Sequence, residues 1–291
     1  MGKAKRSRQR SSPARRERPA WRRYAPTIVV SIAVVGMVVL GLTGGDAAPE
    51  APPASTEALA AVTSVPASTL DAIGAPDSVD PSKIRPLPTG EPALERDGLP
   101  LVTYIGAEFC PYCAAERWPM VVALSRFGTF SGLTSTVSGP APEPYPETAT
   151  LTFHGVSYTS DYLALSAAEF ATNVPDGAGG FTPLDTLTAE QQRILDTYDV
   201  AAYVGSDGGV PFVLIGNRYG WVGASYDVGL LTGRTFDEIA LGLADPQDEV
   251  ARAIGGTANV ITAMLCQLTG GEPGDVCSSA GVVEASALLP A

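Results

Sequence analysis

The spacing of apolar and polar residues divides the chain into an apolar stretch, a proline-rich stretch and a long globular part. Residues 26–45 carry no charged side chain and are almost wholly apolar, over the length that a helix needs to cross a bilayer core. Residues 46–60 are rich in proline and alanine and predict an extended linker, because such a segment cannot gather a hydrophobic core. Residues 61–291 alternate short apolar runs with turn and capping residues, which predicts a folded domain.

Apolar runs within the globular part predict its strands. Leu101–Ile105 combines apolar and β-branched residues as a buried strand does, and Thr150–His154 alternates as a second strand would. Phe212–Ile215 follows a proline, which a sheet accepts at the start of a strand. Gly216–Asn217 then predicts a hairpin turn into Tyr219–Val222.

Two helix signals flank the first strand. Residues 66–74 predict a short helix that ends at its glycine. Pro111 suits the first position of a longer helix, where its missing N–H costs nothing, and Gly128 is the expected end. Pro119 should kink this helix or interrupt its hydrogen bonding.

Three further helices are predicted downstream. Thr188 and Thr235 each stand three residues before a Gln or Glu, the pattern of a capping box. Asp245–Pro246 supplies a cap and a first helical residue for a last long helix, which reaches Cys266. Strands and helices alternate along the chain, so the fold class is α/β.

Charge is distributed unevenly along the chain. The first 23 residues hold ten of the 19 Lys and Arg and one acid, so the remainder carries nine basic and 30 acidic residues. Because positive flanks stay in the cytoplasm, residues 1–25 are expected to form a basic cytoplasmic tail, and the domain is expected to be extracytoplasmic. A cleaved signal peptide is the alternative. The acidic domain argues against nucleic-acid binding, since it would repel phosphates.

All four cysteines follow the apolar stretch, in a compartment where disulfides persist. Cys110 and Cys113 form a C-x-x-C between a predicted strand and a predicted helix. The pair predicts a redox dithiol, with a static disulfide or half of a zinc site as alternatives. Cys266 and Cys277 predict a structural disulfide that ties the last helix to its tail, with an electron relay to the first pair as the alternative.

The position of the C-x-x-C assigns roles to its members. A helix N-terminus favours an anion, so Cys110 is the predicted nucleophile, and Cys113, one turn further on, is expected to resolve the mixed disulfide. Tyr112 should shape the exposed rim. Glu108 would oppose thiolate formation and Arg117 would favour it. The sequence alone does not decide which of the two charges dominates.

Residues 107–113, Ala-Glu-Phe-Cys-Pro-Tyr-Cys, resemble the active-site junction of the thioredoxin-like superfamily, in its glutaredoxin-type C-P-Y-C form. Gly209-Val210-Pro211-Phe212 is similar to the loop in which that superfamily sets a cis-proline against the cysteines. The resemblance implies a cis Val210–Pro211 bond, with Val210 pairing to an extended substrate and Pro211 lining its groove. It also implies a thioredoxin-like fold with a helical insertion between Cys113 and Pro211 and a C-terminal helical extension, preceded by one transmembrane helix.

The chain further resembles a group of membrane-anchored thioredoxin-like proteins of unknown function. It departs from thioredoxins in two places. Tyr104 stands six residues before the first cysteine, where thioredoxins carry a buried acid, and Phe109 stands where they carry tryptophan. Both departures disfavour a reductase of the thioredoxin type.

Together these observations predict a single-pass membrane protein that acts as a thiol–disulfide oxidoreductase on the thiols or disulfides of exported proteins, with a possible membrane redox partner. The alternatives are a non-catalytic thioredoxin-fold module for binding or assembly at the cell surface, and a reductase fed by a membrane electron donor. No cofactor and no metal are expected. His154, the one histidine, is expected to be an ordinary strand residue.

Overall fold

The computed structural model describes residues 53–75, 85–87 and 90–289. The predicted tail (1–25), the predicted anchor (26–45) and residues 46–52 of the predicted linker lie outside these residues. Within the described ranges, no helix has the length and apolar character that crossing a bilayer requires.

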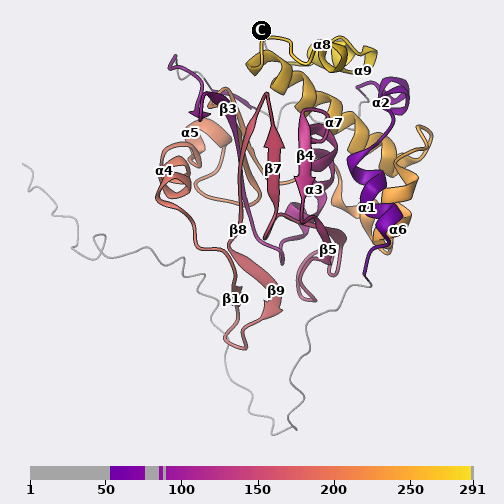
Figure 1. Ribbon diagram of the computed structural model, residues 1–291. Coiled ribbons are helices and arrows are strands. Elements are labelled where there is room, and N and C mark those ends of the chain that lie inside the picture. The colour runs from indigo at the N-terminus through magenta and orange to yellow at the C-terminus, as the bar shows by residue number, and fades with distance from the viewer. Residues whose placement is uncertain (1–52, 76–84, 88–89, 290–291) are drawn as a thin grey trace, which may run out of the picture. The chain divides into compact units, whose positions relative to one another are not determined.

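The described chain is a mixed α/β structure built on strand β3 (Leu99–Gly106), which lies in the middle of the main sheet (Figure 1). β8 (Ala164–Glu169) runs parallel to β3 along one side. β11 (Phe212–Ile215) runs antiparallel along the other side, and the hairpin to β12 (Tyr219–Val222) extends the sheet as predicted. Short strands β1 (Arg85–Pro86) and β2 (Glu95–Arg96) pair with β12 and β3.

Alternate residues of β3 face two different hydrophobic clusters, because side chains of a strand point to opposite faces. Leu101 and Ile105 pack with residues of α4 (Ala189–Tyr198) and α5 (Ala201–Val204). Val102 and Tyr104 pack with α3 (Pro111–Leu124) and α7 (Glu249–Leu268) on the other face. The sheet therefore lies between two helical layers, visible on either side of it in Figure 1.

Helix α3 begins at Pro111 as predicted and is buried from Cys113 to Leu124. It continues through Pro119, which lacks the N–H that would bond the carbonyl of Ala115. The Tyr226 hydroxyl donates to that carbonyl instead, at 2.9 Å, so the predicted interruption of the hydrogen bonding is local and the helix runs on to Leu124. The prediction that Gly128 ends the helix is wrong, because α3 ends at Leu124 and Gly128 opens β4 (Gly128–Ser131). A Cβ there would lie 2.4 Å from the Thr159 carbonyl of the neighbouring strand, so close approach explains this glycine.

The insertion between Cys113 and Pro211 is made mainly of strands, and the prediction of a helical insertion is wrong. β4 pairs with β7 (Ser157–Ser160), and β5 (Thr134–Val137) pairs with β6 (Ala149–Thr152), where the second strand was expected. β9 (Ala171–Pro175) and β10 (Phe181–Pro183) form a further hairpin. Threonine, which favours pleated backbone, occurs in all six of these strands, and the short helices α4 and α5 follow them in the insertion.

The N-terminal described residues correct the predicted linker boundary. α1 (Thr56–Thr63) is capped by the Ser55 side chain and buries Ala58 and Val62 against α3 and α6 (Phe236–Gly242). Residues 56–60 are thus helix rather than linker. Ala58 and Val62 are four positions apart, so they lie on the same face of α1, and that face packs on the domain. α2 (Ala67–Ile73) ends at Gly74 as predicted.

The capping boxes at Thr188 and Thr235 are both confirmed. The predicted start of the last long helix is wrong: α7 begins at Glu249, because the Asp248 carboxylate caps its first N–H groups, at 2.8 and 3.0 Å. Asp245 instead accepts from Gln247 within a turn. Turn η2 (Val228–Leu231) precedes α6, and α8 (Gly274–Cys277) and α9 (Ala280–Ser286) follow α7.

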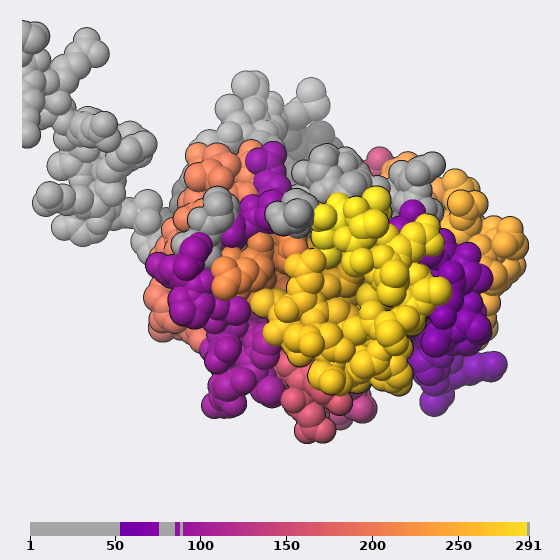
Figure 2. Space-filling model, turned by 90° about the horizontal axis from the view of Figure 1, so that it is seen from above, coloured from indigo at the N-terminus to yellow at the C-terminus, as the bar shows by residue number. Residues whose placement is uncertain are grey.

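The C-terminal helices are fastened to the N-terminal ones. The Asn259 amide donates to the carbonyls of Leu70 and Gly74, both at 2.8 Å, and Gly281 N–H donates to Asp71. Figure 2 shows the C-terminal residues in yellow beside the indigo N-terminal ones. Both ends of the described chain therefore belong to one packed face.

Candidate functional site

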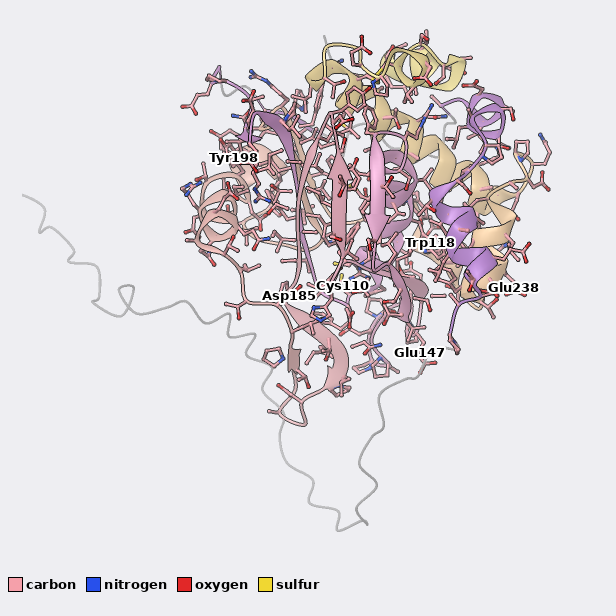
Figure 3. All side chains as sticks on the ribbon, in the orientation of Figure 1. Cys110, Trp118, Glu147, Asp185, Tyr198 and Glu238 are labelled. Atoms are coloured by element: carbon pink, nitrogen blue, oxygen red, sulfur yellow. A yellow bond between two sulfur atoms is a disulfide. The ribbon has the colours of Figure 1, made fainter. Side chains whose placement is uncertain are left out.

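The candidate site is the Cys110–Cys113 dithiol at the N-terminus of α3, and Cys110 is labelled in Figure 3. Cys110 is the N-cap residue, and its sulfur accepts the backbone N–H of Cys113 at 3.4 Å. Cys110 is 5 % exposed and Cys113 is fully buried, and both are free thiols. The arrangement places one sulfur at the end of the helix dipole and the other inside the core.

A distant loop completes the site. The Val210–Pro211 peptide bond is cis, as the resemblance implied, and the Cys110 thiol donates to the Val210 carbonyl at 3.7 Å. Asp199 at the end of α4 holds the start of this loop, because its carboxylate accepts from Gly209 and its carbonyl accepts from Gly208. Cys110 and Val210 are thus in contact although they are one hundred positions apart in the sequence.

The two thiols differ in acidity. A hydrogen bond from the Cys113 side chain lowers the pKa of Cys110 despite its burial, and the Arg117 charge lowers it further. Burial raises the pKa of Cys113 well above its usual range. Cys110 is therefore the sulfur that ionises first, and Cys113 keeps its proton.

An aromatic rim surrounds the buried sulfurs. Tyr112, 41 % exposed, meets Tyr145 from the insertion edge-on, with ring centroids 6.4 Å apart. Ser138 and Thr148 hydroxyls both donate to the Tyr145 carbonyl and fix that loop. Phe109 stacks on Phe181 of β10, with centroids 4.2 Å apart. The sequence indicated Tyr112 but not Tyr145 or Phe181, since only the path of the inserted strands brings them here.

Beneath the thiols lies a buried ion pair. Arg117, on the same helix, donates to both carboxylate oxygens of Glu169 at 2.7 and 2.8 Å, with both side chains at zero exposure. The sequence named Arg117 as favouring the thiolate, and its charge does lower the pKa of both cysteines. Glu169 was missed, because only the parallel pairing of β8 with β3 sets it opposite Gly106.

His154 is not a strand residue, because β6 ends at Thr152. Its Nδ1 lies 2.7 Å from a carboxylate oxygen of Asp185, and the other oxygen of Asp185 accepts from the Glu169 backbone N–H. No partner for this histidine could be predicted from the sequence, since Asp185 is 31 positions away. The pair helps hold the end of β8.

The second cysteine pair, Cys266 and Cys277, is joined by a disulfide that links the end of α7 to α8. These helix ends lie at the opposite edge of Figure 1 from the β9–β10 hairpin, whereas Cys110 lies toward that hairpin in Figure 3. The bonded pair offers no free thiolates for a four-cysteine zinc site. Within the described part of the chain, no three or more His, Cys, Asp or Glu residues are grouped to hold a metal ion.

Removing this disulfide tests its role. The double variant Cys266→Ser/Cys277→Ser is expected to lower the free energy of unfolding by roughly 3 kcal/mol, because the unfolded chain regains the entropy of a short loop. Urea denaturation measures the loss, and the reactivity of Cys110 should be unchanged. Loss of Cys110 oxidation by added disulfide in the still-folded variant would favour the relay instead.

The loop at Asp199 provides a pH-dependent test. Burial raises the pKa of Asp199 to about 6, so the folded state binds more protons than the unfolded state between about pH 4 and pH 6. This carboxylate therefore costs stability as pH rises through 6. Asp199→Asn keeps an acceptor for Gly209 and should stabilise the protein at pH 8 by at most about 1 kcal/mol, since the group is half-exposed and screened. Denaturation at pH 8 and pH 4.5 should give a gain at the first pH only.

The fold and the site together define a mixed α/β protein with a buried dithiol facing a cis-proline loop. A family model described as a domain of unknown function (DUF929) matches residues 90–176. The match includes β3, the dithiol, α3 and the insertion as far as β9, but not the Val210–Pro211 loop. No curated protein and no solved structure matches the chain.

Proposed function

We propose that this chain is a thiol–disulfide oxidoreductase of the thioredoxin-like superfamily, with Cys110 as nucleophile and Cys113 as resolving thiol. The observation that carries the proposal is the 3.7 Å contact between the Cys110 sulfur and the carbonyl before cis-Pro211. An extended substrate that pairs with the backbone of Val210 would present its sulfur beside Cys110, with Pro211 and Tyr112 lining the groove.

The topology of the sheet supports the superfamily assignment. The strand order β8-β3-β11-β12, with a parallel first pair and antiparallel pairs after it, is what a thioredoxin-like fold requires. The dithiol follows the central strand and the proline precedes the third. The inserted hairpins and the C-terminal helices are additions around this core.

The reaction exchanges two electrons. In oxidation, a substrate thiolate attacks the Cys110–Cys113 disulfide at Cys110, that S–S bond breaks, and Cys113 leaves as thiolate. A second substrate thiolate then attacks the substrate sulfur, a substrate disulfide forms, and Cys110 leaves carrying the electron pair. The substrate is oxidised and the protein is reduced to the dithiol, which gains the protons that the substrate thiols lost.

The acidity of Cys110 favours the oxidising direction. A low pKa stabilises the reduced form of the pair, and a stabilised reduced form makes the disulfide a stronger oxidant. We place the substrates among exported proteins, because the apolar residues 26–45 and the basic residues before them predict an anchor with the domain outside the membrane. A reductase supplied by a membrane electron donor is the reverse use of the same site.

The burial of both sulfurs favours a second candidate. Cys110 is 5 % exposed and Cys113 is not exposed at all, so little of either cysteine is open to a substrate. A thioredoxin-fold module that binds partners through Tyr112 and Tyr145, without turnover, would also fit such a rim.

The reduction potential of the 110/113 pair separates these possibilities. The protein would be equilibrated with glutathione buffers, alkylated and digested, so that the peptide with both cysteines is read separately from the 266/277 disulfide. A potential of about −120 mV with turnover on a reduced, unfolded protein supports the oxidant, and one of about −270 mV supports the reductase. No exchange with either class of substrate would leave the binding module.

A further inference from the structure

Arg117 uses only part of its hydrogen-bonding capacity. Its Nε and Nη2 donate to Glu169, and Nη2 also donates to the Ala107 carbonyl at 2.8 Å. Its Nη1 is buried and has no hydrogen-bond partner. Because Glu169 occupies the Nε and Nη2 side of the guanidinium, Nη1 lies on the side turned away from that carboxylate. Arg117 stands four residues after Cys113 on α3, so the two side chains share a helix face.

Tyr104 brings a second unused donor to the same place. Its ring belongs to the β3 face that packs on α3, and its hydroxyl is buried without a nitrogen or oxygen partner. Gly106 leaves room for it, since a Cβ at Gly106 would lie 2.3 Å from the Tyr104 oxygen. Burial raises the pKa of Tyr104 well above its usual range, and the neighbouring Cys113 thiol raises it further.

Two buried donors without acceptors are unusual, because each loses its hydrogen bonds to water and gains nothing in return. Both are explained if an acceptor forms there during the reaction. Cys113 is fully buried and neutral in the dithiol, but it must carry negative charge whenever it attacks or leaves. Cys113 has no exposure to bulk solvent, so neighbouring protein donors are the groups placed to stabilise that charge.

We propose that Arg117 Nη1 and the Tyr104 hydroxyl form a preformed anion site for the Cys113 thiolate, with Glu169 as the positioning residue that orients Arg117. The proposal rests on the proposed function and names the groups that stabilise the Cys113 thiolate in its resolving step. When Cys113 attacks the Cys110 sulfur of a mixed disulfide, the bond between Cys110 and the substrate sulfur breaks and the Cys110–Cys113 bond forms. The substrate thiolate leaves with the electron pair and takes up a proton from solvent, which replaces the one that Cys113 released.

The charged and titratable groups around Cys113 come from all three packed elements: Cys110 and Arg117 from α3, Tyr104 from β3 and Glu169 from β8. The Arg117 charge lowers the pKa of Cys113 and the Glu169 charge raises it, with the effect of Arg117 the larger. Removing a donor and removing the acid should therefore shift the acidity of Cys113 in opposite directions.

The test follows a preformed mixed disulfide between Cys110 and a thionitrobenzoate group, whose release reports attack by Cys113 across a pH series. Tyr104→Phe should slow release about tenfold near neutral pH and move the midpoint of the profile upward, as expected for a lost hydrogen bond to a charged group. Glu169→Gln keeps an acceptor for Arg117 and should move the midpoint downward. Formation of the mixed disulfide at Cys110 should change less than about threefold with Tyr104→Phe, since that attack does not need the Cys113 thiolate.

Tyr226→Phe is the matched control, because it removes another buried tyrosine hydroxyl that contacts α3, at the Ala115 carbonyl. It should reduce stability without moving the midpoint. Unchanged release in Tyr104→Phe, or the same midpoint shift in Tyr226→Phe, overturns the anion site while leaving the proposed function intact. Failure of the unmodified protein to form or resolve any mixed disulfide overturns the proposed function itself.

Discussion

Cys113→Ser is expected to convert the protein into a trap that accumulates mixed disulfides with substrates that carry a disulfide, because the Cys110 thiolate attacks one of their sulfurs and the other leaves as thiolate. Cys110 keeps its place at the helix N-terminus, and a serine hydroxyl can still donate to its sulfur, so the attack by Cys110 survives. The resolving thiol is gone, so the linkage to substrate persists. Non-reducing electrophoresis after acid quench and alkylation should show adducts that reductant removes.

The matched variants sharpen this result. Cys113→Ala removes the hydrogen bond that chiefly lowers the pKa of Cys110, so its adducts should form more slowly at pH 7 than those of Cys113→Ser. At a pH well above the ordinary thiol pKa the two variants should form adducts at equal rates, because Cys110 is then ionised in both. Cys110→Ser should form no adduct and show no turnover. Normal turnover in Cys110→Ser would exclude Cys110 as the nucleophile.

Among single substitutions at the described residues around the dithiol, Arg117→Met is expected to lower the free energy of unfolding most. It leaves the Glu169 carboxylate buried without its counter-ion, which costs about 3–5 kcal/mol in such pairs. Burial already raises the pKa of Glu169, and the loss of Arg117 raises it further. The variant should therefore regain stability as pH falls and Glu169 takes up a proton, opposite to ordinary acid denaturation.

The double variant Arg117→Met/Glu169→Met provides the control, because it removes the uncompensated charge along with its cause. Urea denaturation of the two single variants and the double variant forms a double-mutant cycle. The double variant should recover most of the lost stability, since apolar replacements of buried pairs are often neutral. If it is no more stable than Arg117→Met, the loss comes from packing of the arginine stem.

Local sequence patterns were enough to place the elements that carry the dithiol. Pro111 set the start of α3, the run at Leu101–Ile105 set β3, and the turn at Gly216–Asn217 set the β11–β12 hairpin, because each depends on neighbours in sequence. The start of α7 was misplaced because Asp245 and Asp248 are both good caps, and only the tertiary packing of α7 chooses between them.

The support around the dithiol was not accessible in the same way. Glu169 reaches Arg117 through the register of two parallel strands, and Tyr145 reaches Tyr112 through an inserted loop. Phe181 reaches Phe109 only because β10 folds back on β9. Each contact joins segments whose distance in sequence leaves no periodic signal, so the same residues look like ordinary surface or core positions in the sequence.

The inserted strands also bear on how far this chain could be shortened. By topology alone, these strands look like an insertion that a short turn could replace. Yet the Trp118 indole donates to the Ala149 carbonyl at 3.1 Å, and the Thr150 hydroxyl donates to the Ala114 carbonyl at 2.7 Å. The inserted strands therefore pack against α3, the helix that carries the dithiol, and help to hold it in place. A shortened version of this protein without these strands would lose contacts that position the helix carrying Cys110 and Cys113.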